Sequence, residues 1–105
     1  MAHVVPGEIR AAQRLVRALE PHGIAADIHA GYGLALVSVW IDLVIWTDGL
    51  VYRWWGGSVS GRSGRRVYAA CPADVPETAA TRIALRHRVL RQAHPPCAPT
   101  RREAS

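Results

Sequence analysis

Apolar residues near the start of the chain recur at the spacing of an amphipathic helix. When residues 7–20 (GEIRAAQRLVRALE) are placed 100° apart, one face carries five apolar side chains, Ile9, Ala12, Leu15, Val16 and Leu19. The opposite face carries three arginines, Arg10, Arg14 and Arg17. Pro6 suits a first helical turn, and Pro21 with Gly23 ends the pattern. These residues therefore predict a helix that buries one face and exposes an arginine stripe.

Short apolar runs follow and predict strands. Residues 24–29 (IAADIH) form the first run, and Gly31-Tyr32-Gly33 interrupts it. Residues 34–39 form the second run and are apolar on nearly both faces, which is typical of a strand inside a sheet. Between Trp40 and Asp42 the chain must either turn or form a bulge, and the sequence leaves both alternatives open.

Two further apolar runs, 43–47 and 50–55, flank Asp48-Gly49 and predict a hairpin, because a two-residue turn with positive φ favours this pair. A loop of that length sets Trp46 opposite Val51 and Leu43 opposite Trp54. The face expected in the core then carries Leu43, Ile45, Leu50, Tyr52 and Trp54. The outer face carries Asp42, Val44, Trp46, Val51, Arg53 and Trp55, with Asp42 placed diagonally from Arg53.

Residues 56–66 (GGSVSGRSGRR) are rich in glycine, serine and arginine, which predicts a loop leading to a further strand at residues 67–71. A second helix is expected from Asp74 to about Gln92, with Glu77 completing a capping box and Pro76 in the first turn. Its core face carries Ala79, Ala80, Ile83, His87 and Leu90, whereas Leu85 and Val89 lie nearly opposite. Residues 94–105 show no periodicity and are expected to form a disordered tail.

Together these elements predict one α+β domain over residues 1–93, in the order α-β-β-β-(β)-α. We expect a small antiparallel sheet of three to five strands, flanked by the N-terminal and the C-terminal helix on one face. The longest apolar run, residues 34–46, is shorter than the roughly 20 residues of a membrane-spanning helix, and residues 1–20 lack a secretory pattern. The sequence thus predicts a cytoplasmic protein with no membrane attachment, whose cysteines, Cys71 and Cys97, remain thiols.

Basic charge is carried by arginine alone: all 13 basic residues are Arg, and Lys, Phe and Asn are absent. These three amino acids have AT-rich codons, so their joint absence indicates a GC-rich genome and weakens any functional argument from arginine abundance. The net charge of +5 nevertheless favours acidic partners such as nucleic acid. Codon bias and a functional basic surface both stay open as explanations.

Patterns for catalysis or metal binding are weak. Gly56 and Gly61-Arg62-Ser63 differ by one substitution from the phosphate-binding pattern G-x4-G-K-[ST], but a strand and not a helix is expected to follow. His87, His94 and Cys97 are spaced too loosely for a zinc site. Asp27 and His29 share a strand face with no nucleophile nearby. We therefore expect no enzymatic activity, no metal and no cofactor.

Residues 31–40 (GYGLALVSVW) and 65–88 (RRVYAACPADVPETAATRIALRHR) resemble small proteins of GC-rich actinobacteria. This resemblance spans most of residues 7–92 and implies an origin, with no activity or site attached. The order α-β-β-β-α is also similar to that of the double-stranded RNA-binding domain. The second helix of that family opens with a lysine-rich segment, whereas residues 76–80 here (PETAA) contain an acid and no base, and Arg82 and Arg86 replace it only in part.

The outer face of the hairpin is the main candidate surface, because Trp and Arg contribute most to protein interfaces. The predicted partner-binding residues are Asp42, Trp46, Arg53, Trp55, Leu85 and Val89. The sequence therefore predicts a non-catalytic accessory or regulatory protein that acts through protein–protein contact, with a homodimer as one form of it. The alternative is a nucleic-acid-binding module that uses Arg10, Arg14, Arg17, Arg62, Arg65 and Arg66.

Overall fold

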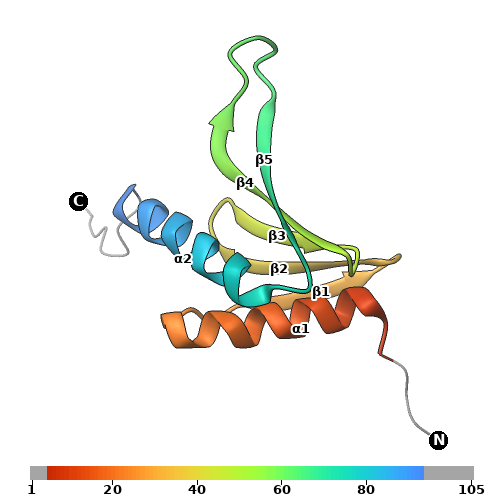
Figure 1. Ribbon diagram of the computed structural model, residues 1–105. Helices are drawn as coiled ribbons and strands as arrows, with labels where there is room; N and C mark the ends of the chain where they lie inside the picture. The colour runs from red at the N-terminus through yellow and green to blue at the C-terminus, as the bar shows by residue number, and fades with distance from the viewer. Residues whose placement is uncertain (1–4, 94–105) are drawn as a thin grey trace, which may run out of the picture.

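The computed structural model describes residues 5–93, which form two helices and a five-stranded sheet (Figure 1). Helix α1 spans Gly7–Leu19 and continues into a short 3-10 turn, η1, at Glu20–His22. The remaining elements are β1 (Asp27–Gly31), β2 (Leu34–Trp40), β3 (Leu43–Thr47), β4 (Val51–Val59), β5 (Arg66–Pro72) and α2 (Pro76–Ala93). Each strand pairs antiparallel with its neighbour in sequence, in the order β1-β2-β3-β4-β5. The predicted α+β fold, with one helix before the strands and one after them, is confirmed.

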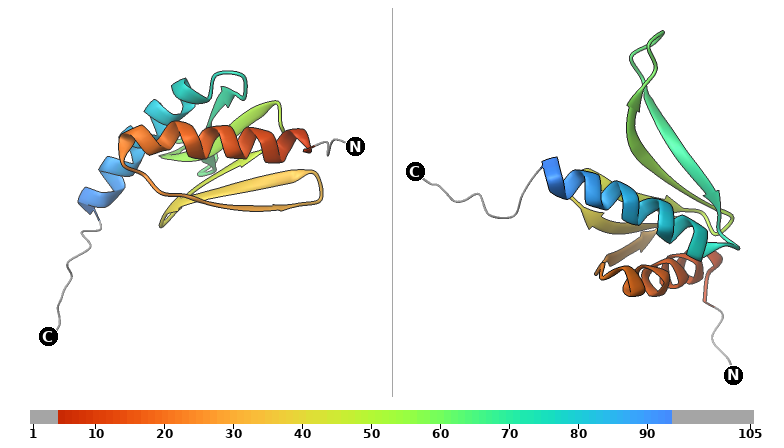
Figure 2. Two further views of the ribbon diagram at one scale, coloured as in Figure 1. Left: turned by 90° about the horizontal axis from the view of Figure 1, so that it is seen from below. Right: turned by 60° about the vertical axis from the view of Figure 1, so that its left-hand side comes forward.

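Both helices cover the same face of the sheet (Figure 2). Helix α1 packs across β1, β2 and β3, while α2 packs against α1, β2 and β5. Within the described part of the chain, the opposite face of the sheet carries no helix. Neither α1 nor α2 is long and apolar enough to cross a lipid bilayer.

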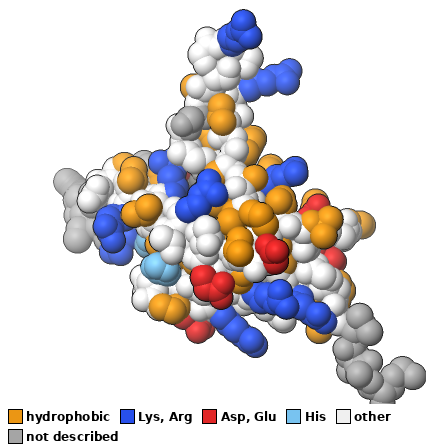
Figure 3. Space-filling model, viewed as in Figure 1, with side chains coloured by type: hydrophobic (Ala, Val, Ile, Leu, Met, Phe, Trp, Pro, Cys, Tyr) orange, Lys and Arg blue, Asp and Glu red, His pale blue; other side chains and the backbone are white. Residues whose placement is uncertain are grey.

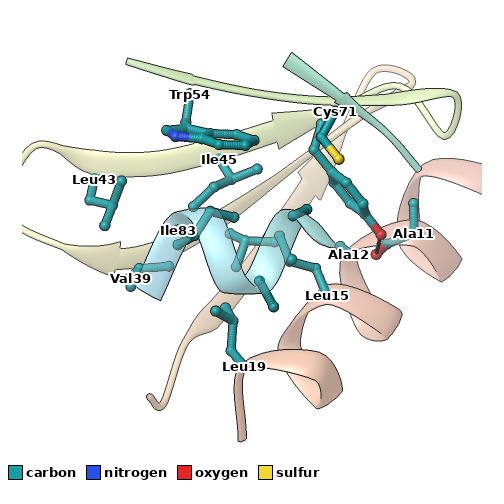
Figure 4. Close-up of a cluster of buried hydrophobic side chains, with 14 of the residues drawn as sticks. Ala11, Ala12, Leu15, Leu19, Val39, Leu43, Ile45, Trp54, Cys71 and Ile83 are labelled. Atoms are coloured by element: carbon teal, nitrogen blue, oxygen red, sulfur yellow. Dashed lines mark hydrogen bonds between the residues drawn. The ribbon is translucent and has the colours of Figure 1, made fainter. Parts of the chain in front are cut away.

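The hydrophobic core fills the space between the sheet and the two helices (Figure 4). Ala12, Leu15 and Leu19 are fully buried, which confirms the predicted apolar face of α1. From α2, Ala79, Ala80, Ile83 and Leu90 are buried as predicted, and Pro76 is buried as well. Burial of large apolar side chains contributes roughly 1.5–3 kcal/mol each, so these layers hold both helices on the sheet.

The β3–β4 hairpin has the predicted faces but not the predicted register. Thr47 pairs with Tyr52 and Trp46 with Arg53, so the loop contains four residues, 48–51, and not two. The side chain of Asp48 accepts hydrogen bonds from the backbone N–H groups of Leu50 and Val51, at 2.9 and 3.2 Å. These bonds stabilise the wider loop, as asparagine and aspartate side chains often do in turns.

A shift of two residues keeps every side chain on its predicted face, because the side chains of a strand alternate with a period of two. Leu43, Ile45, Tyr52 and Trp54 are accordingly buried. Leu50 is the exception, since it lies in the loop and is 80% exposed, and the prediction that it enters the core is wrong. Thr47 takes an inward position beside them and is buried.

Between β2 and β3 the chain both bulges and turns. The pairing shifts between Ser38 and Trp40, so that Val39 is buried while Trp40, which pairs with Leu43, reaches His87 of α2. The chain then turns at Ile41–Asp42, where Asp42 has a φ of 61°. Such a bulge adds one residue to one strand and redirects the side chains that follow it.

The β4–β5 hairpin is longer than predicted and projects from the body of the molecule (Figure 1). Residues 56–59 belong to β4, so the connecting loop contains only residues 60–65. Trp55 pairs with Tyr68 and Ser58 with Val67, which leaves Gly56 and Gly57 without partners in β5. A bulge of this kind bends the strand. We call the part of the hairpin beyond it, residues 56–67, the arm.

Two other boundaries differ from the predicted ones. Strand β1 begins at Asp27, because Gly23 adopts a φ of 74° after η1 and residues 24–26 remain irregular while Ile24 packs into the core. Helix α2 begins at Pro76 and not at Asp74. Val75 therefore directly precedes the helix, and the predicted Asp74–Glu77 capping box does not form.

Five strands separate the helices, two more than the three on which the likeness to the double-stranded RNA-binding domain rests. The predicted tail, residues 94–105, lies outside the described residues.

Candidate functional site

The uncovered side of the sheet presents a largely apolar surface. Alternation along β2 and β3 turns Leu36 and Trp46 outward as a cross-strand pair, while their neighbours Ala35 and Ile45 enter the core. Leu36 and Trp46 are 38% and 37% exposed. We call this surface the open face and define it by Leu34, Leu36, Val44, Trp46, Val51, Arg53 and Tyr68.

An aromatic pair lies at the centre of the open face. The rings of Trp46 and Tyr68 lie 5.4 Å apart between centroids, with their planes tilted by 36°. Trp46 belongs to β3 and Tyr68 to β5, so the two rings meet across β4. Aromatic pairs at this spacing contribute about 0.5–1.5 kcal/mol beyond area burial, and they present large rigid surfaces.

A depression of about 240 Å³ lies beside this pair, and a charged residue of each sign lines it. Arg53 and Asp48 are these residues, and Leu34, Trp46 and Val51 supply apolar walls. Backbone N–H groups of the loop are the main reason that the pKa of Asp48 lies below its usual value, and the positive charge of Arg53 adds to the effect. Asp48 therefore stays ionised beside Arg53.

Asp42 does not belong to this group. The observed register sets Arg53 opposite Trp46, and Asp42 lies in the turn before β3, four positions from Trp46. The predicted diagonal pairing of Asp42 with Arg53 depended on the two-residue loop and is wrong for that reason. Trp46 and Arg53 do lie together, as predicted.

Trp55 lies at the base of the arm, in contact with arginines. The guanidinium carbon of Arg66 lies 4.0 Å from the centroid of the Trp55 ring, and that of Arg86 lies 6.0 Å from it. Arg86 comes from α2, on the helix-covered side of the sheet. Trp55 thus faces the junction between the arm and α2, and it is only half-buried there.

Leu85 and Val89 are exposed on α2, at 57% and 53%. Because α2 covers the other side of the sheet, the structure separates this pair from the open face. Among the predicted partner-binding residues, Trp46 and Arg53 therefore lie on the open face, and Trp55 borders it through its pairing with Tyr68. Asp42 lies in the β2–β3 turn, and Leu85 and Val89 lie on α2.

The predicted nucleic-acid residues also divide into two groups. Arg10, Arg14 and Arg17 are exposed on α1, and a groove between α1 and α2 brings Arg14 and Arg17 to the same walls as Asp74 and Glu77. Arg62, Arg65 and Arg66 lie on the arm, away from α1 (Figure 3). The acidic side chains beside α1 offset its positive charge, whereas residues 51–72 contain no acid.

The arm ends in a hydrogen-bonded turn. The backbone N–H of Ser60 bonds to the carbonyl oxygen of Arg65 at 2.7 Å, and that of Gly64 bonds to the carbonyl oxygen of Ser60 at 2.8 Å. The Ser60 hydroxyl also accepts from the backbone N–H of Arg62. Because a strand, β5, follows this turn, the loop lacks the helix that a phosphate-binding loop requires.

Within residues 5–93, no cluster of three or more His, Cys, Asp or Glu side chains could hold a metal ion. Cys71 is a buried free thiol. His87 packs edge-on against Trp40, with ring centroids 5.5 Å apart. The pKa of His87 is lowered mainly by burial and, to a smaller extent, by the nearby charge of Arg91.

Sequence reasoning missed Tyr68 on the open face and the contact of Arg86 with the arm. Tyr68 could have been found from its strand, since residues 67–71 were predicted to form one, but neither the partner nor the register of that strand was predicted. The position of Arg86 depends on how α2 crosses the sheet, and no local pattern encodes that crossing.

Comparisons with protein-family models, with curated proteins and with solved structures gave no match. The open face and the arginines of α1 and the arm remain the two candidate binding surfaces.

Proposed function

We propose that this protein is a non-catalytic binding protein that acts through protein–protein contact at the open face. The observation that carries this proposal is the one-sided covering of the sheet, which leaves Trp46, Tyr68, Leu34 and Leu36 exposed around Arg53. Aromatic residues and arginine are the side chains most enriched in protein interfaces.

The partner that fits best is a second copy of the same chain. Arg53 and Asp48 line one depression, so a two-fold axis through the open face can set the Arg53 of each copy against the Asp48 of the other. Two such faces can stack like the layers of a β-sandwich, about 10 Å apart. The resulting dimer would cover the apolar side chains that the monomer exposes.

Sedimentation velocity over a concentration series tests this proposal. We expect a dimer that forms at micromolar concentration, and we expect Trp46→Ala to shift it toward monomer by at least tenfold in dissociation constant. Ile41→Ala is the matched control, because Ile41 is exposed in the β2–β3 turn, outside the open face. A single monomeric species at several hundred micromolar, or equal effects of both substitutions, would contradict a homodimer through this face.

A further inference from the structure

A line of arginines runs from α2 onto the arm. Arg82 and Arg86 lie one helical turn apart on α2, and Arg66 is the first residue of β5. Arg62 and Arg65 lie at the tip, where Figure 3 shows basic side chains on the projecting part of the surface. The nearest acid in α2, Glu77, lies nine residues before Arg86, about 13 Å along the helix axis. We call these five residues the arginine track.

Two tryptophans hold the inner part of the arginine track in place. Trp55 contacts both Arg66 and Arg86, and the guanidinium carbon of Arg82 lies 5.1 Å from the centroid of the Trp54 ring. Arg82 also donates from Nη1 to the carbonyl oxygen of Ala70 at 2.9 Å. A guanidinium group that lies against a ring keeps N–H groups at its edge for an external acceptor. These contacts place the guanidinium groups of Arg66, Arg82 and Arg86 against tryptophan rings of β4.

The fold sets Arg86 against Trp55 and Gly57, neither of which carries a negative charge. The Arg86 guanidinium group packs on Gly57, where a Cβ atom would lie 2.7 Å from Nη2, and only glycine allows this approach. Its Nε is buried and has no hydrogen-bond partner within residues 5–93. Keeping a partly buried cation without a carboxylate costs free energy, which a bound anion would reduce.

We propose that the arginine track binds the phosphate groups of a single nucleic-acid strand, which would run from α2 along the arm. Arginine forms paired hydrogen bonds with phosphate oxygens, and several arginines in one line match a ligand whose negative charge repeats. Val59 and Val67 are exposed on the arm and offer apolar contact to unpaired bases. The inner end of this site adjoins the open face, because Trp55 pairs with Tyr68. The proposal nevertheless does not depend on the function proposed for that face.

Fluorescence anisotropy with a labelled 20-nucleotide oligothymidine and the full chain tests the site, at about 50 and 200 mM salt. We expect micromolar binding at low salt that weakens as salt rises, because each phosphate contact on a single strand adds about 0.7 to the log–log slope. The double substitution Arg66→Gln with Arg86→Gln should weaken binding at least tenfold and reduce the slope by about 1.4. Arg10→Gln with Arg17→Gln removes the same charge from α1 and should change affinity less than threefold.

Three results would overturn the proposal. They are no binding at low salt, equal losses in the two double variants, and stronger competition by polyglutamate than by unlabelled oligonucleotide. The last result would assign the arginine track to an acidic protein. Arg66 is exposed, so Arg66→Gln alone keeps the test valid if the Arg86 variant fails to fold by circular dichroism. Trp46→Ala should leave oligonucleotide affinity unchanged, which separates this test from that of the open face.

Discussion

The hydroxyl group of Tyr52 donates a hydrogen bond of 2.6 Å to the carbonyl oxygen of Ala11, and this bond joins β4 to α1 through the core. Tyr52 is fully buried. Replacing it with phenylalanine keeps the ring and removes the donor. We expect Tyr52→Phe to lower the free energy of unfolding by about 1 kcal/mol, measured by urea denaturation at pH 7. An unchanged or higher stability would show that the bond adds nothing to the packing of the ring.

Burial also makes Tyr52 sensitive to alkali, since it raises the pKa of the phenol to about 12. In the unfolded chain a tyrosine ionises near pH 10, so between pH 10 and about 12 the unfolded state releases a proton that the folded state retains. Stability from this group is complete below pH 10 and falls above it, by up to about 1.4 kcal/mol for each pH unit. We expect Tyr52→Phe to remove this part of the decline, while exposed Tyr32 and Tyr68 remain in both proteins.

At Gly49 the β3–β4 loop closely approaches the start of α1. Its φ is 98°, and a Cβ atom would lie 2.9 Å from the carbonyl carbon of Gly7. We expect Gly49→Ala to destabilise the fold for two reasons, backbone strain and displacement of α1. Gly33→Ala is the matched control, because Gly33 also has a positive φ but nothing within 4 Å of the added atom. Thermal unfolding should show about 1 kcal/mol of strain for Gly33→Ala and at least about 1 kcal/mol more for Gly49→Ala.

Two leucines distinguish the observed register from a two-residue loop. Leu43 is fully buried and Leu50 is 80% exposed. We expect Leu43→Ala to cost about 2–5 kcal/mol in unfolding free energy, and Leu50→Ala to change it by less than about 0.5 kcal/mol. A large loss for Leu50→Ala in chemical denaturation would place that side chain in the core and contradict the four-residue loop.

His87 should make the fold sensitive to acid. Its pKa is lowered by burial and, second, by Arg91, so the folded protein resists protonation that the unfolded chain accepts near pH 6.5. Stability from this group is therefore present above pH 6.5 and is lost as the pH falls below it. We expect His87→Gln to reduce the difference in unfolding free energy between pH 7 and pH 5.

Local periodicity predicted the helices and the faces of the strands well. The apolar face of α1 and the inward positions Leu43, Ile45, Tyr52 and Trp54 were correct because burial depends on alternation, which a shift of two residues preserves. The loop length was not predictable from Asp48-Gly49 alone. The side-chain bonds of Asp48 to the following N–H groups favour a wider turn, and the dipeptide fits both lengths.

The contacts around the arm could not be predicted from the sequence. Gly56 and Gly57 indicated a loop, although they form a bulge inside β4. Arg86 and Gly57 are 29 positions apart in the chain, and their contact depends on the angle at which α2 crosses the sheet. The charge of the arginines and the lack of acids in residues 51–72 were visible in the sequence, but the placement of Asp74 and Glu77 beside α1 was not.

Because of the bulge at Gly56–Gly57, the length of the arm can change without a loss of stability in the rest of the domain. Beyond it, Val59 and Val67 are exposed, and β4 no longer pairs with β3. Residues added to or deleted from both strands of the arm in equal number would lengthen or shorten it while the core stays intact. Arm length and tip sequence can therefore vary between related chains without a change in the body of the domain.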